Sequence, residues 1–216
     1  MKKLTLLIVL ICLAPSISAQ NAFGIKAGVN FASQRILVSD DWEKSLYPLL
    51  SATVYKQIEF SEHTNIILEF GLLQTGSKHK SKVENVSLTT ETYVNRFVFS
   101  PGVNFKISEK YSLGLGSYFS YGIDRVSKST SVSKSTSLSY GIFGDYVSTK
   151  LTTKLIDGEK FDYGMNFSIN RFFKNSFFVS GSYSFGFKNL NVHYDDPDIG
   201  FRMNRGILFS LGYIFI

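Results

Sequence analysis

Residues 161–187 read FDYGMNFSINRFFKNSFFVSGSYSFGF, and on either side of a central break every second residue is large and apolar. The residues between them are small or polar, mostly Ser, Gly and Asn. An alternation of period two predicts β-strands, because successive side chains of a strand point to opposite faces. Two such runs joined at Lys174-Asn175-Ser176 predict a β-hairpin with one aromatic face and one small, polar face.

The same alternation recurs along the chain and predicts eight strands. Short turns, such as residues 61–64 and 108–110, alternate with long polar segments. Eight antiparallel strands with short turns at one end and long loops at the other are typical of an all-β, up-and-down transmembrane barrel. The predicted strands are residues 23–31, 50–60, 66–73, 96–105, 113–123, 161–170, 177–187 and 206–215, and the long segments are 33–47, 77–92, 125–160 and 189–203.

The bulk of the apolar face decides which side of the sheet points outward. A soluble barrel also alternates, but with its apolar face inside. The apolar sets of the eight strands contain about forty side chains, about half of them Phe or Tyr, whereas a small eight-stranded barrel encloses on the order of a dozen. The Gly, Ser and Asn set fits inside. Residues 177–187, tilted by ~40°, reach roughly 25 Å, the height of the apolar band of a membrane barrel.

Residues 1–20 have the features of a secretory signal peptide. A charged start is followed by an apolar stretch at residues 4–14 and then by small residues. The apolar stretch is too short to span a bilayer as a helix. We predict cleavage within residues 18–20 and a barrel domain at residues 21–216. The only cysteine, Cys12, lies in the apolar stretch, so we expect no disulfide in the barrel.

Four short motifs resemble the PorT-like outer-membrane β-barrel family. They are FGIKAGVNF at residues 23–31, FVFSPG at 97–102, YSFGFKN at 183–189 and LGYIF at 211–215. The resemblance spans most of the chain and implies an eight-stranded barrel. It implies little about activity, because most members of the family have no assigned activity. The namesake is linked to protein secretion and gliding machinery. The chain departs from the family in ending on Ile216, where an aromatic residue is common.

Several ionisable residues fall on the small, polar face and are therefore predicted to lie inside the barrel. Charges in a narrow, dry lumen must pair with one another. We favour a structural, charge-paired plug over a gated polar path or a catalytic cluster, and a filled eight-stranded barrel is not a porin. The predicted cluster consists of Lys26, Glu59, Glu69, Arg96 and Asp162.

Three lysines in the predicted loop at residues 77–92 share the parity of the outward-facing Leu72. Lys78, Lys80 and Lys82 would then lie just above the bilayer and face lipid headgroups. The hypothesis is that they contact lipopolysaccharide phosphates. The alternative is a flexible basic loop.

The longest predicted loop, residues 125–160, has alternation of its own. Residues 147–155 keep the parity of the following strand, whereas the other arm needs a bulge near Asp124 to continue the preceding strand. We favour a hairpin that rises above the membrane with Ile142 and Phe143 at its tip, over a disordered low-complexity loop. An apolar tip and open strand edges are candidate contacts for a partner protein.

An enzymatic alternative depends on the loop at residues 189–203. His193 with Asp195 or Asp196 could supply two parts of a lipid hydrolase triad, but no nucleophile is singled out. The same acidic residues with Asp198 lack the full ligand spacing of a calcium loop. We expect no catalytic site, no metal and no cofactor.

We therefore predict a monomeric outer-membrane barrel of a Gram-negative bacterium that acts in surface interaction, adhesion, or envelope assembly and secretion. The alternatives are an outer-membrane lipid-modifying hydrolase or acyltransferase and a small channel. Expected partners are membrane lipids and lipopolysaccharide, the barrel assembly machinery, and an unknown protein at residues 125–160. The net charge of +6 is too small and dispersed to indicate nucleic acid binding.

Overall fold

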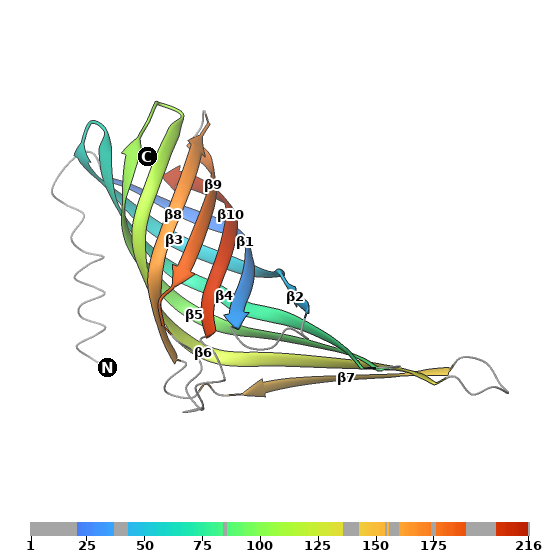
Figure 1. The fold of residues 1–216 in the computed structure, drawn as a ribbon. Helices are drawn as coiled ribbons and strands as arrows, with labels where there is room; N and C mark the ends of the chain where they lie inside the picture. The colour runs from blue at the N-terminus through green and yellow to red at the C-terminus, as the bar shows by residue number, and fades with distance from the viewer. Residues whose placement is uncertain are drawn as a thin grey trace.

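The computed structural model of the chain describes residues 21–36, 43–83, 86–135, 143–153, 155, 160–173, 176–188 and 202–215. These residues form one antiparallel sheet of ten strands (Figure 1). No helix within the described ranges has the length and apolar character needed to cross a membrane. The strands are β1 (Asn21–Ile36), β2 (Glu43–Ser45), β3 (Tyr47–Ser61), β4 (Thr64–Val83), β5 (Val86–Lys106), β6 (Tyr111–Ser135), β7 (Phe143–Thr153), β8 (Phe161–Phe172), β9 (Phe177–Gly186) and β10 (Arg202–Phe215).

Eight of the strands close into a barrel. The order β4-β3-β1-β10-β9-β8-β6-β5 is completed by the pairing of β4 with β5, so the ring has no open edge. β2 adds to β4, and β7 adds to β6, outside the ring. Each barrel strand covers one predicted strand, except that β9 ends at Gly186, one residue before the predicted end. The eight-stranded up-and-down barrel is confirmed.

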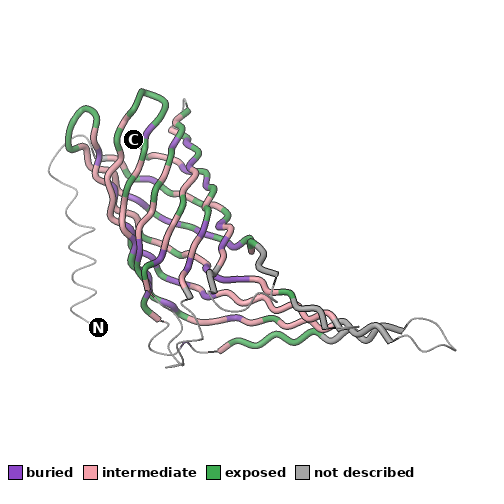
Figure 2. The backbone as a smooth tube through the Cα atoms, viewed as in Figure 1, coloured by how far each residue is buried: buried purple, intermediate pink, exposed green. Residues whose placement is uncertain are grey.

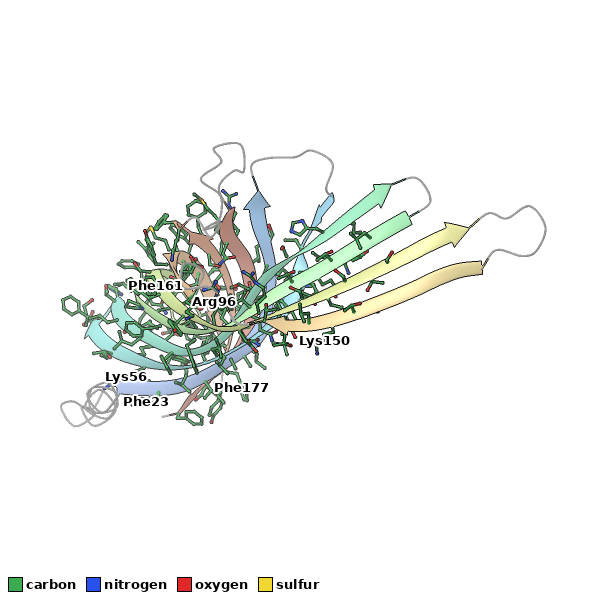
Figure 3. The ribbon with its side chains drawn as sticks, turned by 90° about the horizontal axis from the view of Figure 1, so that it is seen from below. Phe23, Lys56, Arg96, Lys150, Phe161 and Phe177 are labelled. Carbon is green, nitrogen blue, oxygen red and sulfur yellow. The ribbon has the colours of Figure 1, made fainter. Side chains whose placement is uncertain are left out.

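The aromatic face points out of the barrel, as the volume argument predicts. Along the barrel strands, buried and exposed residues alternate (Figure 2). Within the opening hairpin, Phe177 is 45% exposed, while its neighbour Phe178 is 5% exposed and lies in the lumen. Figure 3 shows Phe23, Phe161 and Phe177 around the outside of the ring of strands and Arg96 within it. The outer wall is therefore an apolar surface suited to lipid.

Pro101 interrupts the ladder of its strand, as expected for a residue without an N–H. It pairs with Leu68 of β4. On the β6 side, the register passes from Phe99↔Phe119 directly to Gly102↔Gly116. The ladder bond is lost on one side only, and the strand continues.

Three strands continue far beyond the barrel at the end opposite the short turns, and β7 is added to them. We call this extension the wing. It consists of residues 76–83 of β4, 86–95 of β5, 124–135 of β6 and all of β7, with β2 paired to β4 along its near edge. In Figure 1 it sweeps sideways from the lower end of the barrel, and Figure 3 shows its strands side by side.

The wing corrects one prediction and confirms another. Residues 77–92 are not a long loop, because β4 runs to Val83 and β5 starts at Val86. Both faces of this segment are polar, so it lacks the apolar alternation that indicates a strand. The hairpin within residues 125–160 is confirmed by the β6–β7 pairing, and so is the bulge near Asp124, since Ile123 is the extra residue where the β5–β6 register shifts.

Candidate functional site

A cluster of large, mostly aromatic side chains lies in the lumen near the short-turn end. Tyr55, Ile67 and Phe178 form a buried cluster, with Phe172 packed against it. The Phe178 ring meets the Tyr55 ring edge-on, with 5.6 Å between ring centroids. Gly212 makes room for it, because a Cβ at Gly212 would collide with the Phe178 ring. The side chains of this aromatic layer come from β3, β4, β8 and β9 and pack as in a soluble core.

A salt bridge and a polar cavity lie above the aromatic layer. Lys26 Nζ is 2.6 Å from Glu69 Oε1 across the lumen. Both residues line a cavity of about 90 Å³ whose other walls include Asn104 and Ser168. A polar cavity of this size has room for several water molecules. Glu59, another of the predicted acids, lies apart from this group near the short turns. Its Oε1 is 3.6 Å from Lys106 Nζ.

Two buried charged side chains lie toward the wing end of the lumen. Arg96 is 2% exposed; its Nε donates to Thr75 Oγ1 at 3.0 Å, and its Nη1 donates to the Lys160 carbonyl at 3.3 Å. Asp162 is 0% exposed. Its Oδ2 accepts hydrogen bonds from Asn204 Nδ2 at 2.7 Å and from the Tyr118 hydroxyl at 3.3 Å.

These contacts join several strands of the barrel, and they explain why residue 186 is a glycine. The residues around Asp162 come from β6, β8 and β10, strands that are far apart in the sequence. Gly186 lies beside them, and a Cβ there would come within 2.7 Å of the Tyr118 hydroxyl. The predicted lumen residues thus fall into three groups, Lys26 with Glu69, Arg96 near Asp162, and Glu59 with Lys106, and not into one cluster.

The wing has two chemically different faces. The face continuous with the lumen is rich in hydroxyl groups that pair across strands. Thr92 Oγ1 is 3.3 Å from Ser127 Oγ, and Thr90 Oγ1 is 3.4 Å from Ser129 Oγ. His79 Nε2 is 2.9 Å from Ser77 Oγ on the same face. We call this the hydroxyl face.

The opposite face continues the outer wall of the barrel and carries a row of charges. The registers Lys78↔Glu91, Glu91↔Lys128 and Lys128↔Lys150 place four charged residues side by side on four strands. Lys78 Nζ is 2.6 Å from Glu91 Oε1. We call this the lysine face. The exposed Lys80 follows Lys78 on the same face.

Glu91 is held in its charged form by this arrangement. The hydrogen bond from Lys78 lowers the pKa of the Glu91 carboxyl, and the charges of Lys78 and Lys128 add to the effect. Tyr47 also donates to Glu91 Oε2 at 3.4 Å. Burial and the nearby Glu91 charge raise the pKa of the Tyr47 hydroxyl, which stays a neutral donor.

Acidification should loosen the wing before the barrel. Because the pKa of Glu91 is lowered in the folded state, its contribution to stability is present above the ordinary Glu value of 4.5 and is lost as the pH falls through the lowered value. As the pH is lowered from 5 through the lowered pKa of Glu91, we expect amide hydrogen exchange in residues 76–95 to become faster, after correction for the intrinsic exchange rates. Glu91→Gln should remove most of this pH dependence. An unchanged pH profile in that variant would contradict the assignment.

Several predicted site residues lie outside the described residues or at their margin. Phe143 pairs with Ser135 at the far end of the β6–β7 hairpin, while Ile142 is not among the described residues. His193 and the acidic residues of the hydrolase and calcium hypotheses also lie outside the described ranges. Lys82 is placed by its register with Ser87. Among the described residues, no group of three or more His, Cys, Asp or Glu could hold a metal ion.

The structure adds residues that the sequence patterns did not single out. Tyr118 and Asn204 have the correct parity to face the lumen, so strand parity could have found them. Lys128 and Lys150 could have been grouped with Lys78 only by knowing the register of three strand pairs. Register depends on the bulge at Ile123, and sequence alternation alone does not fix the position of a bulge.

A closed barrel with an apolar outer wall and a polar lumen is the structure of a transmembrane β-barrel protein. The outer membrane protein beta-barrel domain family matches residues 18–191, and the chain belongs to this family. It is an outer-membrane protein of a Gram-negative bacterium. The match is to the general barrel family and does not single out a PorT-like subgroup.

Solved structures of other outer-membrane proteins are similar at low identity. Ail of Yersinia pestis is 15% identical with a TM-score of 0.45, over 91% of this chain and 100% of that one. Neisserial surface protein A is 9% identical with a TM-score of 0.42, over 91% and 100%. The outer membrane protease OmpT of Escherichia coli is 8% identical with a TM-score of 0.41, over 92% and 99%. No curated protein matches the chain.

Proposed function

We propose that this outer-membrane barrel is a surface interaction protein and that the wing is its binding element. The observation that carries the proposal is the free edge of β7. Within the described residues, β7 pairs with β6 along one edge, and no strand covers the other. Residues 148–152 at this edge are exposed (Figure 2). An uncovered strand edge can accept a strand from another protein, which gains main-chain hydrogen bonds.

Rigidity supports the same function. The wing is the continuation of β4, β5 and β6, three strands held in the closed ring, and not a loop tethered at its ends. A partner that binds an ordered edge does not have to supply the free energy of ordering it. The cavity described in the lumen, about 90 Å³, has room for a few water molecules and not for a protein partner. The proposal makes the chain a binding protein and not an enzyme, and a role in adhesion or in a secretion apparatus, as in PorT-like proteins, is compatible with it.

Shortening the wing tests this proposal. Because Lys128 pairs with Lys150, residues 129–149 can be replaced by Asn-Gly, which forms a tight two-residue hairpin turn. A matched control replaces residues 81–88 by Asn-Gly between the paired Lys80 and Thr89 and leaves β7 complete. Both variants keep the barrel, which is checked by heat-dependent gel mobility.

The readout is site-specific photo-crosslinking on intact cells. A photoreactive residue at Thr149, on the wing, should give discrete protein adducts, and the same residue at Ile169, on the lipid-facing wall, should not. Crosslinked adducts are identified with the protein that has the full-length wing. Cell-surface adhesion is compared between the two shortened variants. Equal adhesion of both variants, or identical adducts at both positions, contradicts the proposal. Turnover of lipid by the purified barrel in vesicles would favour the enzymatic alternative.

A further inference from the structure

The row of charges on the lysine face carries more positive charge than its one carboxylate balances. Glu43 of β2 pairs with Lys80, outside this row. In the row Lys78, Glu91, Lys128 and Lys150, one carboxylate lies among three ammonium groups, and it already binds Lys78 at 2.6 Å. Lys128 and Lys150 lie directly opposite each other on β6 and β7, and both are exposed. Like charges at directly opposed positions destabilise a strand pair. An anion placed between them removes this repulsion.

The position of the row relative to the membrane indicates which anion. Along β4 and β5 the outward face passes from the apolar Leu72 and Phe97 to the polar Gln74 and Asn95, whose side chains are hydrogen-bonded at 2.9 Å. This change marks the end of the lipid-facing wall. The lysine row begins at Lys78↔Glu91, four residue pairs further along the same strands, which is two pairs further on the outward face.

Two tyrosines stand between the wall and the lysine row. Tyr47 and Tyr93 contact each other, with ring centroids 6.4 Å apart. Tyr93 pairs with Gly76, one alternation before the Lys78–Glu91 pair. Tyrosines followed by lysines are the usual order of side chains across a membrane interface, where the rings lie at the headgroup level.

The wing leaves the barrel sideways (Figures 1 and 3). Its lysine face is the continuation of the outer wall, and its hydroxyl face is the continuation of the lumen. Where a barrel wall bends outward, its outer face becomes the underside. Docking on the membrane in this way would place the lysine face against the lipid headgroups and direct the hydroxyl face outward.

We propose that the wing docks on the outer leaflet of the membrane through Lys78, Lys80, Lys128 and Lys150, which bind the phosphate groups of phosphorylated glycolipids such as lipopolysaccharide. This extends the sequence-based hypothesis for Lys78, Lys80 and Lys82 to a second pair of strands. It does not depend on β7 binding a partner protein. Docking would hold the wing at a fixed height and present its hydroxyl face to the exterior.

Fluorescence quenching in reconstituted vesicles tests the docking. The sequence has one cysteine, Cys12, within the predicted signal peptide, so a cysteine introduced in the barrel domain gives a single labelling site. Ser148→Cys places the fluorophore on the lysine face, and Thr149→Cys places it on the hydroxyl face. The vesicles contain phosphatidylcholine with bisphosphorylated lipid A, with dephosphorylated lipid A, or with neither, and a headgroup nitroxide as quencher.

We expect the fluorophore at position 148 to be quenched more strongly than the fluorophore at position 149. This difference should occur only in vesicles with bisphosphorylated lipid A. High salt should weaken the quenching. Each lysine near an anionic surface changes the ratio of docked to undocked wing about 5-fold. The pair Lys128→Gln and Lys150→Gln should therefore lower that ratio roughly 25-fold. The control pair Lys106→Gln and Lys110→Gln, near the short turns, should leave it unchanged.

Three outcomes would overturn the docking proposal. They are equal quenching with dephosphorylated lipid A, equal quenching at positions 148 and 149, and quenching that survives the Lys128 and Lys150 substitutions. Loss of fold is distinguished by heat-dependent gel mobility of each variant. Failure here leaves the adhesion and crosslinking results of the shortened wing unaffected, because those do not depend on lipid phosphate.

Discussion

Replacing Arg96 by Met should lower the free energy of unfolding of the barrel by about 1 to 3 kcal/mol for each buried acceptor that loses its donor. Arg96 and Asp162 are both buried, and Arg96 donates to the carbonyl of Lys160, two residues before Asp162. Without the guanidinium, the Thr75 hydroxyl and the Lys160 carbonyl lose the hydrogen bonds that Arg96 donates. Urea titration of the barrel in detergent micelles, followed by gel mobility, measures the change.

A double variant tests the physical reason. If the two buried charges interact, Arg96→Met combined with Asp162→Asn should recover part of the stability lost by Arg96→Met alone. Arg171→Met is the matched control, since Arg171 is exposed and lies over aromatic rings, at 5.1 Å from Phe173 and 5.8 Å from Tyr111. If the double variant is as unstable as the sum of the single ones, the two side chains are not coupled.

Replacing Phe178 by Ala should cost about 3 to 5 kcal/mol of stability. Phe178 is buried between Tyr55 and Phe172, with 5.6 Å between ring centroids on each side. Its removal leaves a cavity near the short-turn end of the lumen that the surrounding rings cannot fill completely. The unfolding titration used for Arg96 measures the loss, and ion conductance across planar bilayers reports whether the opened layer admits water.

The adjacent Phe177 provides the control. Phe177→Ala removes a ring of the same size from the lipid-facing side of the same strand, where acyl chains can fill the space. Its cost should be smaller, because no enclosed cavity remains. If Phe177→Ala destabilises the barrel as much as Phe178→Ala, the aromatic layer does not act as a packed core.

The sequence was sufficient to predict the barrel because membrane and lumen impose opposite demands on alternate residues. In residues 177–187, Phe, Val and Tyr alternate with Ser and Gly, and β9 has the face assignment that this pattern predicts. Volume then excludes the inverted arrangement. The strand count, the direction of the aromatic face and the interruption at Pro101 all follow from these local constraints.

The wing and the contacts in the lumen could be predicted only in part. Outside the membrane both faces of a strand can be polar, so residues 77–92 looked like a loop although they form most of a hairpin. In the lumen, parity predicts that Arg96 and Asp162 point inward, but not which residue each one meets. The partners of each side chain depend on the stagger of the strands around the ring. This stagger brings residues of β6, β8 and β10 to the same height in the barrel.

The extra residue in β6, Ile123, affects how the sequence of the wing can change during evolution. It lies between the pairs Arg96↔Gly122 and Asn95↔Asp124. Losing it would leave the pairs on both sides intact, whereas losing one residue elsewhere in a regular part of β6 would exchange the two faces of everything beyond. The chain can therefore gain or lose a residue at Ile123 without reversing the two faces of the rest of β6. The part of β6 outside the membrane can diverge in sequence while the part inside stays constrained by lipid.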